Sequence, residues 1–347
     1  MVPIAGKLGR WGVLLGIIGC PMGTLIAQSY QTMVSNGPSA NRVDIVFVGD
    51  GYTSAEVGTL YPQHVQSQLN HMFGGSQAPF PRYSKFFNAH RVNVVSQQSG
   101  ADKPPEGIFV NTALDASYWW DGTTERLLYF SNTKAQTAVT TALAGTGIDV
   151  DMRYGTVNDT KYGGGGGTWA VYAGGNSSAL EVALHELGHS FAGLADEYFS
   201  SSPAYTGPEL SEPNVTNSPS SGKWDRWVGY NDPTTSIGPI GYYEGGRYYQ
   251  FGIYRPSVNS KMRNLNRPFD AISREQFVAR IYAEVNPLDS WLANGATLQD
   301  PPSLWVDSID PDVIEVEWFL NGQSLDVFGE NLSIMSLGAL GIGPGTY

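Results

Sequence analysis

The chain contains both short apolar runs and longer segments whose apolar residues have helical spacing. Residues 43–48 and 92–96 are rich in valine and have strand length, so they predict β-strands. Residues 60–72, 125–144 and 273–285 carry apolar positions with the period of a helix. No repeat of fixed period interrupts this mixture. The pattern predicts an α/β (α+β) fold with a mixed sheet.

A further helix is predicted over residues 178–193. Ser178 and Glu181 have the spacing of a capping box, in which each side chain bonds the other residue's backbone N–H. Residues 182–194 supply the apolar positions of a buried helix, and Gly193 is a plausible stop. Residues 200–221 are rich in Ser, Asn and Pro and predict a loop.

The predicted helix carries the sequence His-Glu-Leu-Gly-His. His185 and His189 stand four residues apart, so both imidazoles project from one helix face and are able to hold one zinc ion. Glu186 lies where it can take a proton from a zinc-bound water. The alternative is a buried helix whose histidines make ordinary hydrogen bonds. We interpret the motif as the core of a zinc hydrolase with Glu186 as the catalytic base.

Catalytic zinc usually takes three protein ligands and leaves a fourth position open. Asp196 is too far along a continuous helix, but a positive φ at Gly193 would fold the chain back towards the metal. Glu197 is the neighbouring alternative, and spacing separates the two poorly. Glu209 and Glu212 lie in a proline-containing stretch that predicts loop, which disfavours a ligand on a second helix.

The segment from His185 to Tyr198 reads His-Glu-x-Gly-His-x-x-x-Gly-Leu-x-Asp-Glu-Tyr. It resembles the signature of the IgA peptidase family of zinc metallopeptidases, a metzincin-like group. Residues 43–53, 79–102 and 254–263 also resemble blocks of that family, and the likeness extends over about residues 40–285. It implies a metzincin-like zinc peptidase domain with a mixed sheet, an active-site helix, one Zn²⁺ ion and Asp196 as the third ligand.

Two departures from related patterns matter. Metzincins proper have Gly and the third ligand at the positions of Ala192 and Ala195, so only the family resemblance supports Asp196. The family often carries Cys just before its methionine, where this chain has Ser260 and Lys261. The change removes no obvious chemistry.

The resemblance assigns two further roles. Met262 is the Met-turn residue, an apolar floor beneath the metal; the alternative is a core methionine. The segment after the glycines at 163–167 predicts a strand that pairs with extended substrate, or else an ordinary edge strand. Its residues are Thr168, Trp169, Ala170, Val171 and Tyr172. The oxyanion donor stays open among Tyr198, Arg247 and the tyrosines of residues 242–249.

Residues 1–29 have the layout of an export signal. Lys7 and Arg10 precede a largely apolar stretch, and Ala27-Gln28-Ser29 offers a small-x-small cleavage site. We expect a protein secreted or held at the cell envelope through a bacterial-type signal. Ile17-Ile-Gly-Cys20 resembles a lipobox, so a lipidated Cys20 is the rival and the only membrane attachment expected. Residues 30–40 are polar and predict a linker to the rest of the chain.

Charge and cysteine content narrow the function. The net charge is −12, and loss of Lys7 and Arg10 with the signal would change it to −14. This acidity disfavours nucleic acid and anionic membranes as partners and is compatible with a polypeptide substrate. Cys20 is the only cysteine, so a mature chain without it has neither disulfides nor a cysteine nucleophile.

After Pro287 the pattern changes. Residues 301–305 and 314–323 alternate apolar and polar positions, and Asn321-Gly322 is a hairpin signal. The stretch resembles the opening strands of an immunoglobulin-like sandwich, yet too few residues remain for seven strands. We predict a catalytic domain over residues 41–288, then either a truncated Ig-like β segment over 300–347 or a small β appendage.

The main hypothesis is an exported zinc-dependent endopeptidase. The alternative is a non-catalytic cell-surface binding protein on a zincin scaffold. The retained Glu186 argues against the alternative, since a protein that only binds has no need of the base.

Overall fold

The computed structural model of the protein describes residues 29–201, 204–220, 222–293, 295, 298, 303–325, 333–338 and 341. Residues 1–28 of the predicted signal 1–29, including Cys20, lie outside these ranges, so export and lipidation stay predictions. In the part of the chain that is described, no helix is both long and apolar enough to cross a membrane.

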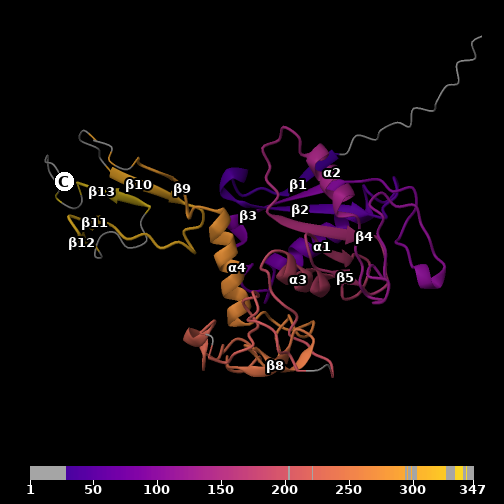
Figure 1. Ribbon diagram of the computed structural model, residues 1–347. Helices are drawn as coiled ribbons and strands as arrows, with labels where there is room; N and C mark the ends of the chain where they lie inside the picture. Colours follow the sequence, from indigo (N-terminus) through magenta and orange to yellow (C-terminus); the bar gives the residue numbers. More distant parts are fainter. Residues whose placement is uncertain are drawn as a thin grey trace, which may run out of the picture.

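A six-stranded mixed sheet forms the centre of a mixed α/β fold, in the order β1-β3-β2-β4-β6-β5 (Figure 1). Its strands are β1 (Ser29–Val34), β2 (Val43–Asp50), β3 (Phe87–Asn93), β4 (Met152–Val157), β5 (Gly164–Gly165) and β6 (Ala170–Ala173). Strands β3, β2, β4 and β6 are mutually parallel, and both edge strands run antiparallel to their neighbours.

Among the described residues, four α-helices accompany the sheet: α1 (Leu60–Phe73), α2 (Asn132–Ala142), α3 (Ala179–Ser190) and α4 (Ala271–Glu284). Short 3-10 helices occur at Ser39–Asn41, Ser84–Phe86, Pro104–Glu106 and Asp225–Trp227. Both faces of β2 are covered. Val43, Ile45 and Phe47 pack in one cluster with α1, α3 and α4. Val46 and Val48 pack in a second cluster with α2. A strand covered on both faces reads as a continuous apolar run, which explains the pattern of residues 43–48.

Several sequence predictions need correction. Residues 30–40 do not form a simple linker, because Ser29–Val34 is strand β1 and pairs with β3. A polar strand fits there because its exposed side chains lie at the sheet edge. The predicted helix 125–144 contracts to α2, which begins after Ser131, whose side chain accepts a hydrogen bond from Lys134 N. The strand expected at 92–96 lies earlier, at Phe87–Asn93.

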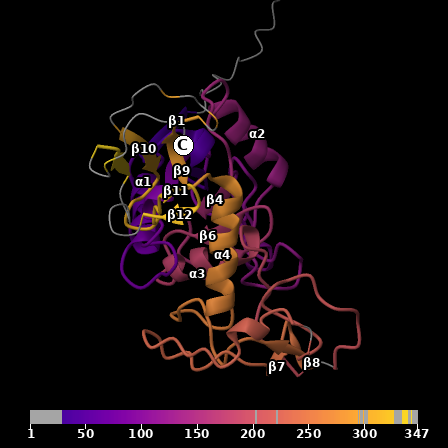
Figure 2. The same ribbon diagram turned by 90° about the vertical axis from the view of Figure 1, so that its left-hand side faces the viewer.

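Residues 196–268 form a separate layer below the sheet, here called the lower module (Figures 1 and 2). Its regular structure is the hairpin of β7 (Tyr243–Gly246) and β8 (Tyr249–Arg255) and one 3-10 helix. The described residues between 200 and 220 contain no helix or strand, as the composition predicts. Two small apolar clusters hold residues of this layer, one centred on Val215 and Ile253 and one on Trp224 and Ile240.

Helix α4 leads from the lower module to a C-terminal β segment (Figures 1 and 2). This segment contains β9 (Leu288–Trp291), β10 (Ser303–Ser308), β11 (Phe319–Leu320), β12 (Gln323–Ser324) and β13 (Ile334–Ser336). The hairpin predicted at Asn321-Gly322 is confirmed, with φ of 51° and 80° at those residues. The segment starts at β9, not at residue 300, because β9 pairs with β10. Its Ig-like character stays a prediction.

The C-terminal segment is tied to the main body by polar contacts. Arg42 Nη1 lies 2.6 Å from Asp289 Oδ1, with the Arg42 side chain almost fully buried. Lys85 Nζ donates to Asp310 Oδ1 at 2.7 Å. Ile309 joins the apolar cluster beneath the sheet. The segment is therefore packed against the main body.

Candidate active site

Helix α3 carries the His-Glu-x-x-His motif beneath the sheet. Its apolar residues Val182, Ala183, Leu184 and Leu187 belong to the large cluster shared with β2 and α1. The capping box is not formed, since Ser178 makes no side-chain cap bond. The other residue of the predicted capping box, Glu181, makes tertiary contacts instead. Its carboxylate accepts a hydrogen bond from Lys261 Nζ at 2.5 Å and lies 2.9 Å from His71 Nε2.

The chain reverses after α3 at Gly193, as predicted. Gly193 has φ +64°, and its N–H donates to the carbonyl of His189 at 3.2 Å, an αL-type helix end. A residue with a side chain would be strained in this conformation. The reversal returns the next residues to the helix face, where Asp196 meets the two histidines.

Three potential ligand atoms converge at this point. His185 Nε2 lies 3.0 Å from Asp196 Oδ1 and 3.2 Å from His189 Nε2. His189 Nε2 lies 3.3 Å from the same Asp196 oxygen. Tetrahedral ligands about 2.0–2.1 Å from zinc are separated from one another by roughly 3.3 Å. The triangle therefore has the size that a tetrahedral zinc ion requires, and its N,N,O donor set suits that metal.

Hydrogen bonds at Nδ1 fix the orientation of both imidazoles. His185 Nδ1 lies 3.0 Å from the carbonyl oxygen of Lys261, and His189 Nδ1 lies 2.6 Å from that of Leu194. Because a carbonyl oxygen only accepts, each Nδ1 carries a proton, so each Nε2 faces the triangle and can ligate a metal once it carries no proton of its own. This is the tautomer that a metal ligand needs, and it argues against two ordinary hydrogen-bonded histidines.

Glu186 lies beside the triangle and faces the groove. It is buried, and its carboxylate makes no hydrogen bond to another described residue. Burial raises the pKa of Glu186 above its ordinary value, while His185 and His189 act in the opposite direction without cancelling it. A carboxylate with a raised pKa and no fixed partner is suited to accept and return a proton.

Asp196 uses its second oxygen for two tyrosines. Tyr198 Oη donates to Asp196 Oδ2 at 2.9 Å, and Tyr248 donates to the same atom. Burial alone raises the pKa of Asp196, yet its hydrogen bonds with His185 and His189 outweigh burial and hold that pKa well below the usual range. The carboxylate is thus kept ionised beside the two imidazoles.

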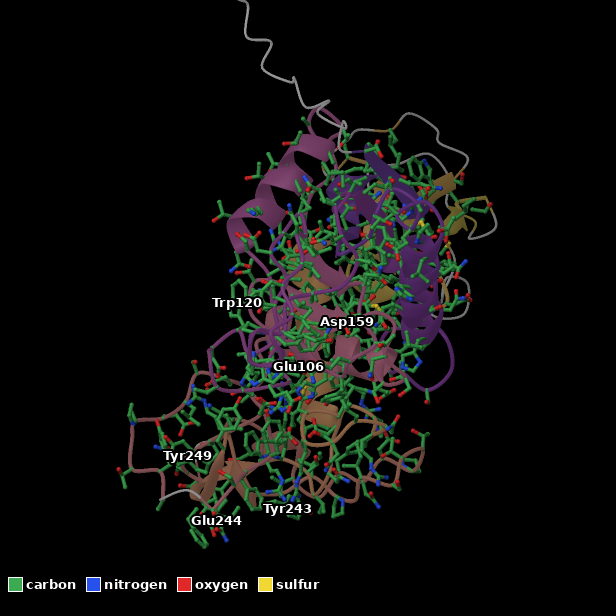
Figure 3. All side chains as sticks on the ribbon, turned by 90° about the vertical axis from the view of Figure 1, so that its right-hand side faces the viewer. Glu106, Trp120, Asp159, Tyr243, Glu244 and Tyr249 are labelled. Atoms are coloured by element: carbon green, nitrogen blue, oxygen red, sulfur yellow. The ribbon has the colours of Figure 1, made fainter. Side chains whose placement is uncertain are left out.

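The β7–β8 turn places Tyr248 beside Asp196. Arg247 and Tyr248 both have positive φ, 45° and 71°, which turns the Tyr248 side chain back towards α3. The other tyrosines of this stretch point elsewhere: Figure 3 shows Tyr243 and Tyr249 at the far end of the lower module. Sequence reasoning included Tyr248 only within a group of phenols, because a turn with positive φ at non-glycine residues leaves no sequence signal.

Glu197 does not join the triangle. Its side chain is fully buried and accepts hydrogen bonds from Ser260 Oγ at 2.6 Å and from Asn214 Nδ2 at 3.0 Å. Burial, reinforced by Asp270, raises the pKa of Glu197 to about 8. Its backbone N–H donates to Met262 O at 2.9 Å. Glu197 therefore ties the Asp196 segment to the turn containing Met262.

Met262 lies beneath the histidine helix and is fully buried. A Cβ added to Gly188 would lie 2.5 Å from Met262 Sδ, so the glycine between the two histidines allows the close approach. The geometry fits an apolar floor, and the same residue also belongs to the apolar core.

The predicted substrate strand needs correction. Thr168 precedes β6, Trp169 is fully buried, and Ala170, Val171 and Tyr172 lie in β6, which is paired on both sides with β4 and β5. This segment is therefore not an open edge. The glycines before it line the groove instead, and a Cβ at Gly166 would lie 2.5 Å from His189 Cβ. The run of glycines thus allows the backbone to approach the metal site closely.

The site opens into a groove with two arms. One cavity of about 540 Å³ is lined by Asp121, Gly164–167, His189, Asp196 and Tyr248, together with His185 and Glu186. A second cavity of about 350 Å³ shares Arg126, Gly164, His185, Glu186 and Tyr198 with the first and continues to Tyr162 and Arg263. Arg126 is a site residue that the sequence did not single out. A larger cavity of about 1040 Å³ lies elsewhere, against α4, and contains none of the three clustered residues.

Comparison with known proteins agrees with this geometry. The family model described as IgA Peptidase M64 matches residues 32–239, which include the histidine helix and Asp196. None of the curated proteins compared with the chain matches it. The match spans more than half of the 347 residues, and it includes the edge strand from Thr32 onwards. The chain therefore belongs to the IgA peptidase M64 family of metallopeptidases, and it is a peptidase acting on polypeptides.

Proposed function

We propose that the protein is an exported zinc-dependent endopeptidase. One observation carries the proposal: His185, His189 and Asp196 form a triangle of metal-ligand size, with the buried Glu186 beside it in an open groove. An endopeptidase needs a groove that a chain can cross, and Glu186 lines both arms of this groove. Its metzincin-like fold, with Met262 as the floor beneath the metal, is part of the same proposal.

A zinc ion held by these three residues supplies a Lewis acid that activates water and polarises a carbonyl group. The other tasks belong to the chain. Glu186 takes the proton from the attacking water and returns it to the leaving amine. The carbonyl groups of Lys261 and Leu194 keep both imidazoles in the ligating tautomer.

The substrate backbone, in this proposal, extends along the glycines at residues 165–167. These residues line the groove beside His189, and glycine is required at Gly166 because a side chain would collide with that imidazole. Bonding to an extended backbone is independent of side-chain identity, so specificity comes from the two arms.

Tyr248 is the residue we favour for stabilising the oxyanion. It lines the groove beside Asp196, and about half of its surface is exposed. Its hydroxyl would exchange the bond to Asp196 for one to the developing negative charge. Tyr198 also lies in the groove, yet it is held by Arg126 Nη2 at 3.0 Å as well as by Asp196.

Replacing Glu186 with Gln tests the mechanism. We expect casein hydrolysis to fall by at least about a thousandfold, because the base is lost, while zinc stays bound at one ion per chain. The matched control is Glu106→Gln, on the face of the main body seen in Figure 3, which should retain full activity. Undiminished hydrolysis by Glu186→Gln would reject Glu186 as the base. Stoichiometric zinc without cleavage of any protein by the wild type would reject the peptidase proposal.

Export is tested separately. Amino-terminal sequencing of the protein recovered from its native host should find residues 1–29 removed. Recovery in the detergent phase with label from a fatty acid at Cys20 would instead establish the lipoprotein alternative.

A further inference from the structure

The smaller arm of the groove is cationic. We call it the arginine arm, because Arg126 and Arg263 both line the cavity of about 350 Å³. Glu186 is the only carboxylate among its lining residues. Arg126 and Glu186 also line the other arm, where Asp121 and Asp196 add two further carboxylates. The arms therefore differ in charge, because Arg263 lines only the arginine arm and Asp121 and Asp196 line only the other.

Both arginines donate hydrogen bonds to uncharged oxygen atoms. Arg126 donates through Nη2 to Tyr198 Oη at 3.0 Å, and Arg263 donates through Nη1 to the carbonyl of Val258 at 2.6 Å. Within the described ranges, neither guanidinium lies within ion-pair distance of a carboxylate. A guanidinium carries five N–H donors, so each retains donors for a ligand.

Their positions are held by aromatic rings. The Arg126 guanidinium lies 5.7 Å from the centre of the Tyr198 ring, and that of Arg263 lies 5.4 Å from the Phe199 ring. Cation–π contacts of this kind orient a guanidinium without cancelling its charge. The arginine arm is thus a preorganised cationic pocket in a protein of net charge −12.

Other charges around the groove are already satisfied. Arg247, in the β7–β8 turn, pairs with Glu212 at 2.8 Å. The Asp121 carboxylate accepts from the backbone N–H groups of Thr123 and Thr124, and these bonds hold its pKa well below the usual range. By contrast, Arg126 and Arg263 bond to uncharged oxygen atoms and keep N–H donors for a ligand from outside the chain.

We propose that the arginine arm selects a substrate carboxylate beside the scissile bond, either an acidic side chain or a free C-terminus. The planar guanidinium fork matches carboxylate geometry. Val182 and Leu265 line the same arm and offer apolar contact for the methylene groups of a Glu side chain. This selectivity rests on the proposed peptidase function and adds the class of bond that the enzyme prefers.

Matched peptides test the selectivity. A series with Glu, Gln or Lys at each of the two positions on either side of the cleaved bond is assayed with zinc-loaded enzyme. At one of these positions we expect kcat/KM for Glu to exceed that for Gln on the order of tenfold, with Lys poorer still. The preference should weaken as ionic strength rises. Peptides ending near the cleaved bond, as a free acid or an amide, show whether a C-terminal carboxylate is accepted as well.

Arginine variants connect the preference to the arm. In Arg263→Gln the Glu/Gln ratio should approach one, and in Arg263→Glu the preference should shift towards Lys. Arg267→Gln is the matched control, because Arg267 is an exposed arginine in the same segment that lines the separate cavity against α4. If an Arg263 variant fails to fold, Arg126→Gln provides the second test of the same ratio.

The outcome separates this inference from the proposed function. Cleavage of Glu and Gln peptides with equal kcat/KM at every position, or a preference that survives loss of either arginine, would overturn the arginine arm. Absence of cleavage of any peptide would instead concern the peptidase proposal. In that event, fluorescence anisotropy with a labelled peptide and zinc-loaded Glu186→Gln still decides the matter. We expect at least about tenfold tighter binding of the Glu peptide than of the Gln peptide.

Discussion

The two halves of the active site are built by different means. The upper half is helix α3 under the sheet, fixed by a large apolar cluster that also contains β2, α1 and α4. The lower half is the module of residues 196–268, whose apolar clusters are small and whose functional groups are held mainly by hydrogen bonds. The upper half supplies His185, Glu186 and His189, and the lower half supplies Asp196 and Tyr248.

This difference indicates which half of the site tolerates substitutions and which half is sensitive to them. Apolar packing holds a helix through many weak contacts, so a single polar change on its groove side leaves the fold intact. A side-chain network loses its geometry when one buried member is left unpaired. Substitutions in the lower module should therefore affect metal binding and catalysis before they affect the sheet.

Loss of the third ligand should have the largest effect. We expect Asp196→Ala to weaken zinc binding by more than about a hundredfold, since even a residue that only orients a ligand contributes about 10- to 100-fold. Zinc content after dialysis against graded chelator measures the change. Asp225→Ala, an aspartate of the lower module whose carboxylate accepts from Tyr242, is the control. Equal zinc retention by both variants would show that Asp196 is not a ligand.

Tyr248→Phe should come next. Removing its hydroxyl takes away the favoured oxyanion donor, so kcat should fall about a hundredfold while KM and zinc content change little. Steady-state kinetics on one peptide, with Tyr198→Phe measured beside it, compare the two tyrosines. A larger loss of kcat in Tyr198→Phe would transfer the role to Tyr198.

Glu197→Ala tests the link inside the lower module. Ser260 and Asn214 would lose a buried partner, which costs about 2 kcal/mol of unfolding free energy. Zinc binding should weaken about tenfold, because the Asp196 segment is no longer tied to the Met262 turn. Urea unfolding and zinc titration measure the two effects. The surface variant Glu315→Ala, at an exposed position of the C-terminal segment, should show neither effect, and zinc affinity unchanged in Glu197→Ala would contradict the link.

The smallest effect concerns the sheet above helix α3, where Asp151 lies just before β4. Burial raises the pKa of Asp151 to about 6, with Glu284 and Asp44 adding to the rise. The unfolded value is about 3.9, so between pH 4 and 6 the native state binds more protons than the unfolded state. Stability contributed by this group is present below pH 4 and is lost as pH rises to 6. Asp151→Asn should show a smaller decline of Tm over that range.

The control for this comparison is Asp307→Asn, at an exposed position in β10. Its Tm should follow the wild-type pH dependence. Identical curves for Asp151→Asn and the wild type would contradict the assignment. Zinc affinity should be unaffected in either variant, because Asp151 lies just before β4, Asp307 lies in β10, and neither belongs to the metal triangle.

The sequence predicted the upper half well. The buried run at residues 43–48, the histidine helix and the turn at Gly193 all depend on local periodicity or on the one residue that accepts a positive φ. Predictions failed where tertiary contacts outcompeted local ones. Glu181 bonds to Lys261 and does not form the predicted capping box. Polar residues 29–34 pair with β3 through backbone hydrogen bonds, which form with any side chain.

The sequence by itself determined that two imidazoles and a carboxylate share one helix, and that the chain can reverse just after it. Only the tertiary structure decided between Asp196 and Glu197 for a place in the triangle, brought Tyr248 to Asp196, and set Arg126 and Arg263 in one cavity. The reason is distance along the chain. Periodicity and turn chemistry act over a few residues, whereas these contacts join segments that only the packed lower module brings together.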